Sequence, residues 1–108
     1  MGIKEGNRFF GNRQFDDAIR EYSETISKYA NSTQHPSINF SEIVEALRNR
    51  GDAYAEKTKS PTQKQARLYA LRAKDSYNMA ITIGLQNQCI FSHFEACANG
   101  IELMNNII

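Results

Sequence analysis

The sequence contains few of the residues that form disulfides, bind metal ions or interrupt helices. It has two Cys, two His, two Pro and six Gly among its 108 residues. Cys89 and Cys97 lie eight positions apart in one predicted helix, so their Cα atoms are about 12 Å apart, beyond disulfide reach. With His35 and His93 they form no CxxC, HExxH or ligand-spaced cluster. We therefore expect no disulfide, no metal site and no cofactor.

Long apolar runs and a net charge of either sign are also missing. Thirteen Lys+Arg against twelve Asp+Glu leave a formal charge of +1, so overall charge cannot drive binding to DNA or an anionic membrane. No apolar run approaches the roughly 20 residues that span a bilayer, and the polar start lacks the apolar region of a secretory signal. We expect one domain over residues 1–108, in the cytoplasm, with neither a membrane nor nucleic acid as its main partner.

Helical periodicity fills most of the chain. Apolar residues recur at helical spacing over 3–10, 14–29, 41–57, about 62–83 and 88–104, and no segment alternates as a strand would. Gly11-Asn12 and Gly84 are expected to end the first and fourth helices, and Ser60-Pro61 to begin the fourth. Two buried stripes are expected to include Leu68 and Leu71 in the fourth helix, and Phe91, Phe94 and Leu103 in the fifth. The fold class is predicted to be all-α.

The helices contain an internal repeat of small and large residues. The first copy runs Gly6, Phe9, Ala18, Tyr22, and the second runs Gly51, Tyr54, Ala73, Tyr77, Ala80. Small residues at fixed points are needed where two helices cross closely, with large residues filling the space beside them. This pattern resembles the tetratricopeptide repeat. The match is assigned to about 1–30 for repeat one and about 41–84 for repeat two, with a terminal or capping helix at about 88–107.

The chain departs from the family's spacing. Gly6 and Gly51 are 45 residues apart, whereas the family repeats every 34 or so. Tyr54 and Ala73 are 19 apart, about ten more than in the family. The extra residues are expected in the 30–43 connection and in the 57–72 stretch, where longer helices or loops can absorb them.

The resemblance implies an α-solenoid of about five antiparallel helices, made of two hairpins plus a capping helix. It also implies a non-catalytic scaffold or adaptor that holds a peptide or helix of another protein in a concave groove. Two and a half repeats are close to the minimum for a continuous core. The chain is therefore expected either to be a segment of a longer protein or to form a homodimer that covers its ends.

The same resemblance assigns the groove residues. The predicted partner-binding set is Ile3, Asn7, Phe10, Arg48, Asn49, Asp52, Cys89 and His93, and the wider groove adds Glu45, Glu56, Ser92 and Ala96. Mixed charge with a few apolar side chains suits a segment that brings both apolar anchors and polar contacts. For Asn7 and Asn49 the competing interpretation is a solvated helix surface, and for Phe10 it is packing between helices.

A co-chaperone function is the first alternative. One subclass of the family holds the C-terminal carboxylates of heat-shock chaperones with Lys and Asn side chains and an Arg. Asn7 and Asn49 match its two asparagines, whereas Ile3 replaces its first Lys, and Cys89 and His93 replace the Lys and Arg of its third repeat. Permanent cations attract a carboxylate most strongly. Arg48 and Arg50, which flank Asn49, compensate only in part.

Charge asymmetry supports a second alternative. Six bases fall within residues 57–74, namely Lys57, Lys59, Lys64, Arg67, Arg72 and Lys74. Such a stretch fits an acidic partner or an RNA backbone, against the simpler interpretation that it is the solvated face of a long helix.

An enzyme is the least supported class. Neighbouring acids such as Asp16-Asp17 point to different sides of a helix, and a helical repeat offers no strained turn to hold a nucleophile. No catalytic residue is predicted.

Overall fold

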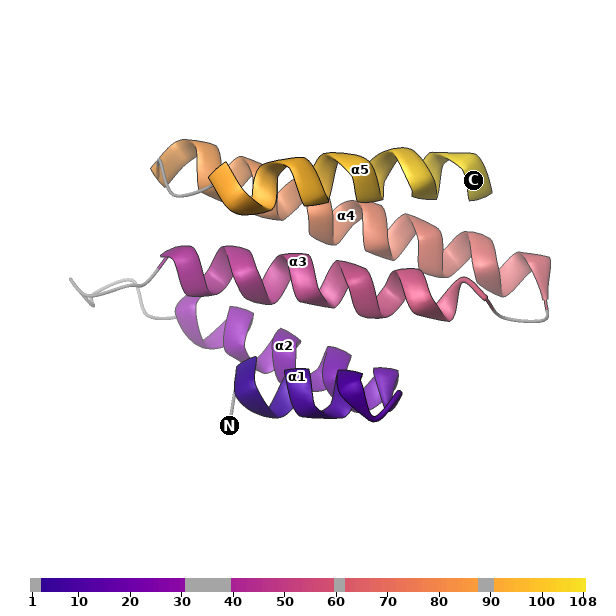
Figure 1. Ribbon diagram of the computed structural model, residues 1–108, viewed down its shortest axis with the longest axis horizontal. Helices are drawn as coiled ribbons and strands as arrows, with labels where there is room; N and C mark the ends of the chain where they lie inside the picture. The colour runs from indigo at the N-terminus through magenta and orange to yellow at the C-terminus, as the bar shows by residue number, and fades with distance from the viewer. Residues whose placement is uncertain (1–2, 31–39, 60–61, 88–90) are drawn as a thin grey trace.

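The described part of the chain contains five α-helices. The computed structural model describes residues 3–30, 40–59, 62–87 and 91–108, and within them no strand occurs. In chain order the helices are α1 (Ile3–Gly11), α2 (Phe15–Ala30), α3 (Phe40–Lys57), α4 (Gln63–Asn87) and α5 (Phe91–Ile107) (Figure 1). The prediction of an all-α fold with five helices is confirmed.

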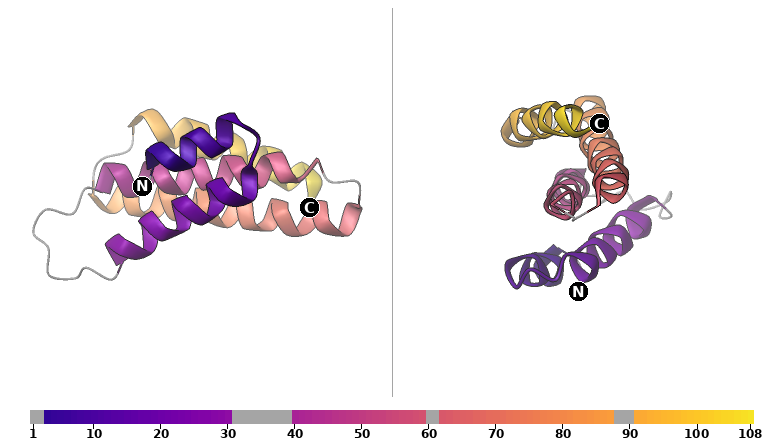
Figure 2. Two further views of the ribbon diagram at one scale, coloured as in Figure 1. Left: turned by 90° about the horizontal axis from the view of Figure 1, so that it is seen from below. Right: turned by 90° about the vertical axis from the view of Figure 1, so that its right-hand side faces the viewer.

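The helices stack in chain order. α1 packs on α2, α2 on α3, α3 on α4 and α4 on α5, and α3 also touches α1 and α5. Among the described residues, the backbones of α1 and α2 do not approach those of α4 and α5. Figure 2 shows two layers, with α1, α3 and α5 in one and α2 and α4 in the other. Each helix therefore packs on the next one, and α3 also meets the helices two places before and after it. The main cluster of buried residues is formed by α3, α4 and α5, with Ile26 of α2 packed against it.

The end of α1 differs in detail from the prediction. The helix ends at Gly11, but the residue in the left-handed conformation is Arg13, with φ 62°. The backbone N–H of Gln14 donates to the carbonyl of Phe9 at 2.8 Å, and that of Arg13 donates to Phe10 at 3.0 Å. These two bonds form a Schellman motif, which satisfies the last carbonyls of a helix. A non-glycine residue therefore adopts the strained position two residues after the expected glycine.

The bounds of α4 also correct the sequence analysis. Ser60-Pro61 lies outside the described residues; the helix begins at Gln63, and the carbonyl of Thr62 accepts from the N–H of Ala66 at 3.0 Å. The prediction that Gly84 ends the helix is wrong, because α4 continues to Asn87 with Gly84 buried inside it. A glycine ends a helix only when the chain turns left-handed after it. At 25 residues, α4 absorbs much of the extra length of repeat two.

The close helix crossings that the small residues predict are formed at the rings of Tyr22 and Tyr77. A Cβ at Gly51 would lie 2.6 Å from Cε1 of Tyr77, and a Cβ at Gly100 would lie 2.6 Å from Cε2 of the same ring. A Cβ at Gly6 would likewise overlap the ring of Tyr22. Real Cβ atoms do not come this close to another atom, so the rings require bare backbone beneath them. The predicted need for small residues is confirmed at Gly6 and Gly51, and the alanines of the repeat, Ala18, Ala73 and Ala80, are fully buried.

Part of the predicted apolar stripes is wrong. Leu68 and Leu71 of α4 are 45% and 51% exposed, and Phe94 and Leu103 of α5 are 42% and 61% exposed. The buried side of α5 is formed instead by Cys97, Gly100 and Met104. The reason is that helical spacing identifies an apolar stripe, but which side of it meets the next helix depends on the crossing geometry.

Replacing Gly51 with Ala is expected to destabilise the fold. Its methyl group would overlap the Tyr77 ring, and overpacking of this kind costs about 1–3 kcal/mol, which exceeds the gain of about 1 kcal/mol in helix propensity. Chemical denaturation of Gly51→Ala measures the loss. Gly11→Ala is the matched control, because a Cβ there meets nothing within 4 Å. Equal stability of the two variants would contradict the ring-on-glycine packing.

Candidate binding groove

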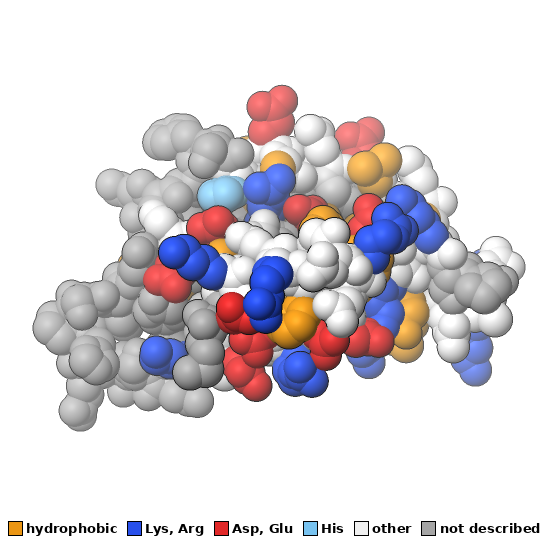
Figure 3. Space-filling model, turned by 60° about the horizontal axis from the view of Figure 1, so that its bottom comes forward, with side chains coloured by type: hydrophobic (Ala, Val, Ile, Leu, Met, Phe, Trp, Pro, Cys, Tyr) orange, Lys and Arg blue, Asp and Glu red, His pale blue; other side chains and the backbone are white. Residues whose placement is uncertain are grey.

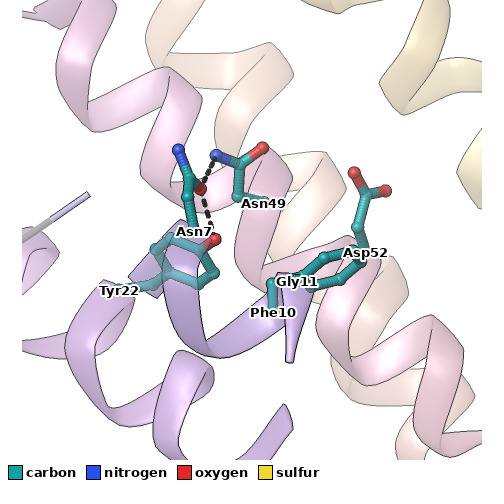
Figure 4. A pocket seen from close by; sticks show the side chains of 6 residues that line it. All are labelled: Asn7, Phe10, Gly11, Tyr22, Asn49 and Asp52. Carbon is teal, nitrogen blue, oxygen red and sulfur yellow. Dashed lines mark hydrogen bonds between the residues drawn. The ribbon is translucent and has the colours of Figure 1, made fainter. Parts of the chain in front are cut away.

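The packing of α1 beside α3 brings together side chains that are far apart in the sequence. Asn7 and Phe10 of α1 and Asn49 and Asp52 of α3 line one open cavity of about 170 Å³, together with Gly11 and Tyr22 (Figure 4). Four of the eight residues predicted to bind a partner therefore share one cavity wall.

Asn7 is the hub of this cavity. Its Oδ1 accepts a hydrogen bond from the Tyr22 hydroxyl at 2.5 Å and another from Nδ2 of Asn49 at 3.1 Å (Figure 4). These bonds join α1, α2 and α3. Among the described residues, Nδ2 of Asn7 and Oδ1 of Asn49 have no partner, so the pair presents one donor and one acceptor to a ligand.

The same unit recurs one repeat further along the chain. The Tyr77 hydroxyl donates to Oδ1 of Asp52 at 2.6 Å, as Tyr22 donates to Asn7. In both copies the acceptor directly follows the glycine beneath the ring, at Gly6 and Gly51. Sequence reasoning treated the tyrosines as space-filling residues and missed this polar role. The available signal was the repeated pattern of glycine followed by Asn or Asp, paired with a Tyr in the next helix.

Burial raises the pKa of both tyrosine hydroxyls. Burial is the main cause that raises the pKa of Tyr22 to about 12, and the charges of Asp52 and Glu45 add to it. The pKa of Tyr77 is raised further, first by burial and then by the charge of Asp52 and its hydrogen bond. A tyrosine hydroxyl is protonated at neutral pH even with its ordinary pKa of about 10, so the raised pKa values extend this form to more alkaline pH. Each hydroxyl donates to its acceptor, Asn7 or Asp52.

The cation predicted in the groove is already paired. Nε of Arg48 lies 3.4 Å from Oδ2 of Asp52, with both side chains about one third exposed. The distance is that of an ion pair, but Nε has no well-aligned hydrogen bond. An ion pair exposed to solvent to this extent contributes little to stability. The Asp52 carboxylate offsets the positive charge of Arg48 at the groove.

His93 is the residue of α5 that belongs to the predicted set, and Cys97 is the one nearest in character to the predicted Cys89. Cys97 lies within electrostatic reach of Arg48 and Asp52; burial raises its pKa to about 11, with Arg48 opposing and Asp52 adding to the shift. His93 lies one turn earlier and has a buried Nδ1 without a partner in the described part of the chain. Cys89 falls outside the described residues. Since Cys97 is fully buried and uncharged, α5 presents no thiolate to the groove.

The remaining predicted residue, Ile3, is the first residue of α1. It is half-buried and does not line the cavity. Within the described ranges, no three His, Cys, Asp or Glu side chains are grouped to hold a metal ion. In the same ranges, no helix combines the length and apolarity needed to span a membrane.

The raised pKa of Tyr22 makes stability depend on alkaline pH. The hydroxyl ionises near pH 10 in an unfolded chain and at about 12 in the folded one. Its stabilising contribution is therefore complete below about pH 10 and lost as the pH rises through about 12. We expect Tyr22→Phe to be less stable than wild type at neutral pH, with the difference shrinking above about pH 10. Urea denaturation across this range measures the difference. A constant difference would contradict the assignment.

The chain has no match among models of known protein families. Curated proteins and solved structures also yield no match. The resemblance to tetratricopeptide repeats therefore depends on the spacing of Gly, Ala and Tyr within this chain alone. What the groove binds has to be inferred from its own side chains and their geometry.

Proposed function

We propose that the chain is a divergent tetratricopeptide-repeat domain that binds a segment of another protein along the layer of α1, α3 and α5, at the groove that the α1–α3 cavity opens there. The observation that carries this proposal is the cavity shared by Asn7, Phe10, Asn49 and Asp52. The cavity wall combines residues of α1 and α3, and Asn7 and Asn49, which contact each other across it, are 42 residues apart in the sequence. The domain acts as a non-catalytic adaptor.

The size and chemistry of the cavity favour a polypeptide. At about 170 Å³ it is smaller than the roughly 300–1,000 Å³ of sites for drug-sized ligands, but it has room for a side chain of a bound segment. The donor on Asn7 and the acceptor on Asn49 complement the C=O and N–H of a peptide unit. Phe10 adds an apolar surface next to them.

The raised pKa values of Tyr22, Tyr77 and Cys97 argue against these three groups acting as bases or nucleophiles. Tyr22 and Cys97 have pKa values raised to about 12 and about 11, and that of Tyr77 is raised as well. A general base or nucleophile works best with a pKa near the working pH. These groups stay protonated at neutral pH, so they serve as donors and packing groups.

A C-terminal chaperone carboxylate is the second candidate ligand, favoured by the direct contact of Asn7 with Asn49. The charges around this pair work against it. Asp52 offsets Arg48, Glu45 is close enough to act on Tyr22, and Ile3 supplies no cation. A desolvated carboxylate without a cation is costly to bind. We therefore propose that the groove binds an internal segment of the partner, or a chain terminus whose binding does not depend on a free carboxylate.

Loss of the asparagine pair is expected to reduce partner binding without unfolding the domain. In Asn7→Ala/Asn49→Ala, the Tyr22 hydroxyl loses its acceptor, at a cost of about 1–3 kcal/mol. Pull-down followed by mass spectrometry compares this variant with Glu24→Ala/Lys28→Ala, which changes two exposed residues of α2. Proteins lost only from the asparagine variant are groove partners. Identical partner lists for both variants would place binding outside the groove.

The charge argument predicts the response to the end of a bound peptide. A chaperone C-terminal peptide with a free carboxylate is expected to bind no more tightly than its C-terminal amide, because Asp52 and Glu45 counter the attraction of Arg48. Isothermal titration calorimetry with the two peptides measures the ratio. If the free acid bound about tenfold or more tightly, a difference of about 1.4 kcal/mol, the co-chaperone function would replace the one proposed.

A further inference from the structure

The exposed face of the N-terminal half of α4 combines positive charge with uncovered leucines. Lys64, Arg67, Leu71 and Lys74 follow one another at i, i+3, i+7 and i+10, which places them along one side of a helix. Leu68 and Arg72 lie on the adjoining row. Leu68 and Leu71 are 45% and 51% exposed. We call these six residues the basic α4 face.

The four cations of this face form no ion pair with another described residue, whereas five of the nine other basic residues do. The ion pairs among the described residues are Arg8 with Glu5, Arg20 with Asp17, Arg48 with Asp52, Lys57 with Asp16, and Lys59 with Glu56. None of them involves α4. Figure 3 shows the resulting mixture of acidic and basic side chains on the face turned forward there.

Folding therefore divides the six-base stretch found in the sequence. Lys57 and Lys59 are neutralised by Asp16 and Glu56. Lys64, Arg67, Arg72 and Lys74 have no carboxylate within ion-pair distance among the described residues, and the one acid in α4 is Asp75. Asp75 also acts electrostatically on Arg50 of α3, and with four cations against this one acid the N-terminal half of α4 keeps a net positive charge.

We propose that the basic α4 face binds an acidic amphipathic segment of a partner protein. Carboxylates of that segment would meet the four unpaired cations, and its apolar residues would cover Leu68 and Leu71. Charge complementarity and the exposed leucines both require this chemistry. The face belongs to the layer of α2 and α4, whereas the groove belongs to the layer of α1, α3 and α5 (Figure 2). The two sites are therefore independent.

Single-stranded RNA fits this face less well. Sequence-tolerant RNA binding depends on exposed aromatic rings on which bases stack, and the face has none. The nearby aromatic residue, Tyr69, is occupied: the Lys57 ammonium lies 4.5 Å from its ring centroid, and Tyr54 stacks on it at 6.5 Å. An anionic membrane would need a wider apolar surface than two leucines to hold a helix in its interface.

The test uses a fluorescent amphipathic peptide with Leu along one helical face and Glu on the flanks. Fluorescence anisotropy compares its binding to wild type, to Arg67→Glu/Lys74→Glu and to Lys4→Glu/Lys28→Glu. The last variant makes the same charge change at exposed residues outside the face. We expect the α4 variant to bind about tenfold more weakly than the control variant, equivalent to about 1.4 kcal/mol, and binding to weaken as salt screens the charges.

A second pair of variants tests the leucines. Leu68→Ser/Leu71→Ser is compared with Leu85→Ser/Leu103→Ser, whose leucines are also exposed but lie off the face. Weaker peptide binding only in the first variant supports the proposal, and circular dichroism confirms that all variants keep their helices. Equal effects within either pair overturn it. It is also overturned if an oligouridine or phosphatidylserine vesicles bind through these residues while the acidic peptide does not.

Discussion

The seating of a tyrosine ring on a glycine backbone is the contact on which the rest of this structure depends. Tyr77 lies between Gly51 of α3 and Gly100 of α5, so one ring sets the spacing of three helices. Tyr22 does the same between α2 and Gly6 of α1. Both tyrosines are almost fully buried, and they are the largest fully buried side chains. Because a methyl group at any of these glycines would meet the ring, ring and glycine have to occur together.

The polar end of each ring connects this packing to the proposed site. Tyr22 and Tyr77 direct their hydroxyls at Asn7 and Asp52, the residues that follow the glycines. A buried hydroxyl without an acceptor would cost about 1–3 kcal/mol, so the acceptors belong to the core as much as to the groove. Hydrogen bonds to the buried hydroxyls hold the groove side chains in place, so a partner would meet side chains that are already oriented.

Two cations of the central helix α3, Arg50 and Lys57, bridge α2 and α4. Arg50 donates to Ser76 of α4 at 3.0 Å and to Ser23 of α2 at 3.2 Å, which ties together two helices whose backbones do not meet. Burial lowers the pKa of Arg50, opposed by Tyr54 and Asp75. Lys57 repeats the bridge seven residues on, between Asp16 and the ring of Tyr69. Cations that hold helices together are thereby separated from those of α4, which remain available to a partner.

The sequence by itself determined the helices, the stacking motif and four residues of one cavity wall. The helices and the stacking motif follow from local periodicity and from the size of Gly, Ala and Tyr side chains, which act over a few turns, whereas the four cavity residues were assigned through the resemblance to tetratricopeptide repeats. Only the tertiary structure decided that Lys57 pairs with Asp16, 41 residues away, that Cys97 lies within electrostatic reach of Arg48, and that Leu68 and Leu71 stay uncovered. These outcomes depend on how far one helix is rotated and shifted against the next. Periodicity within a single helix contains no information about that rotation.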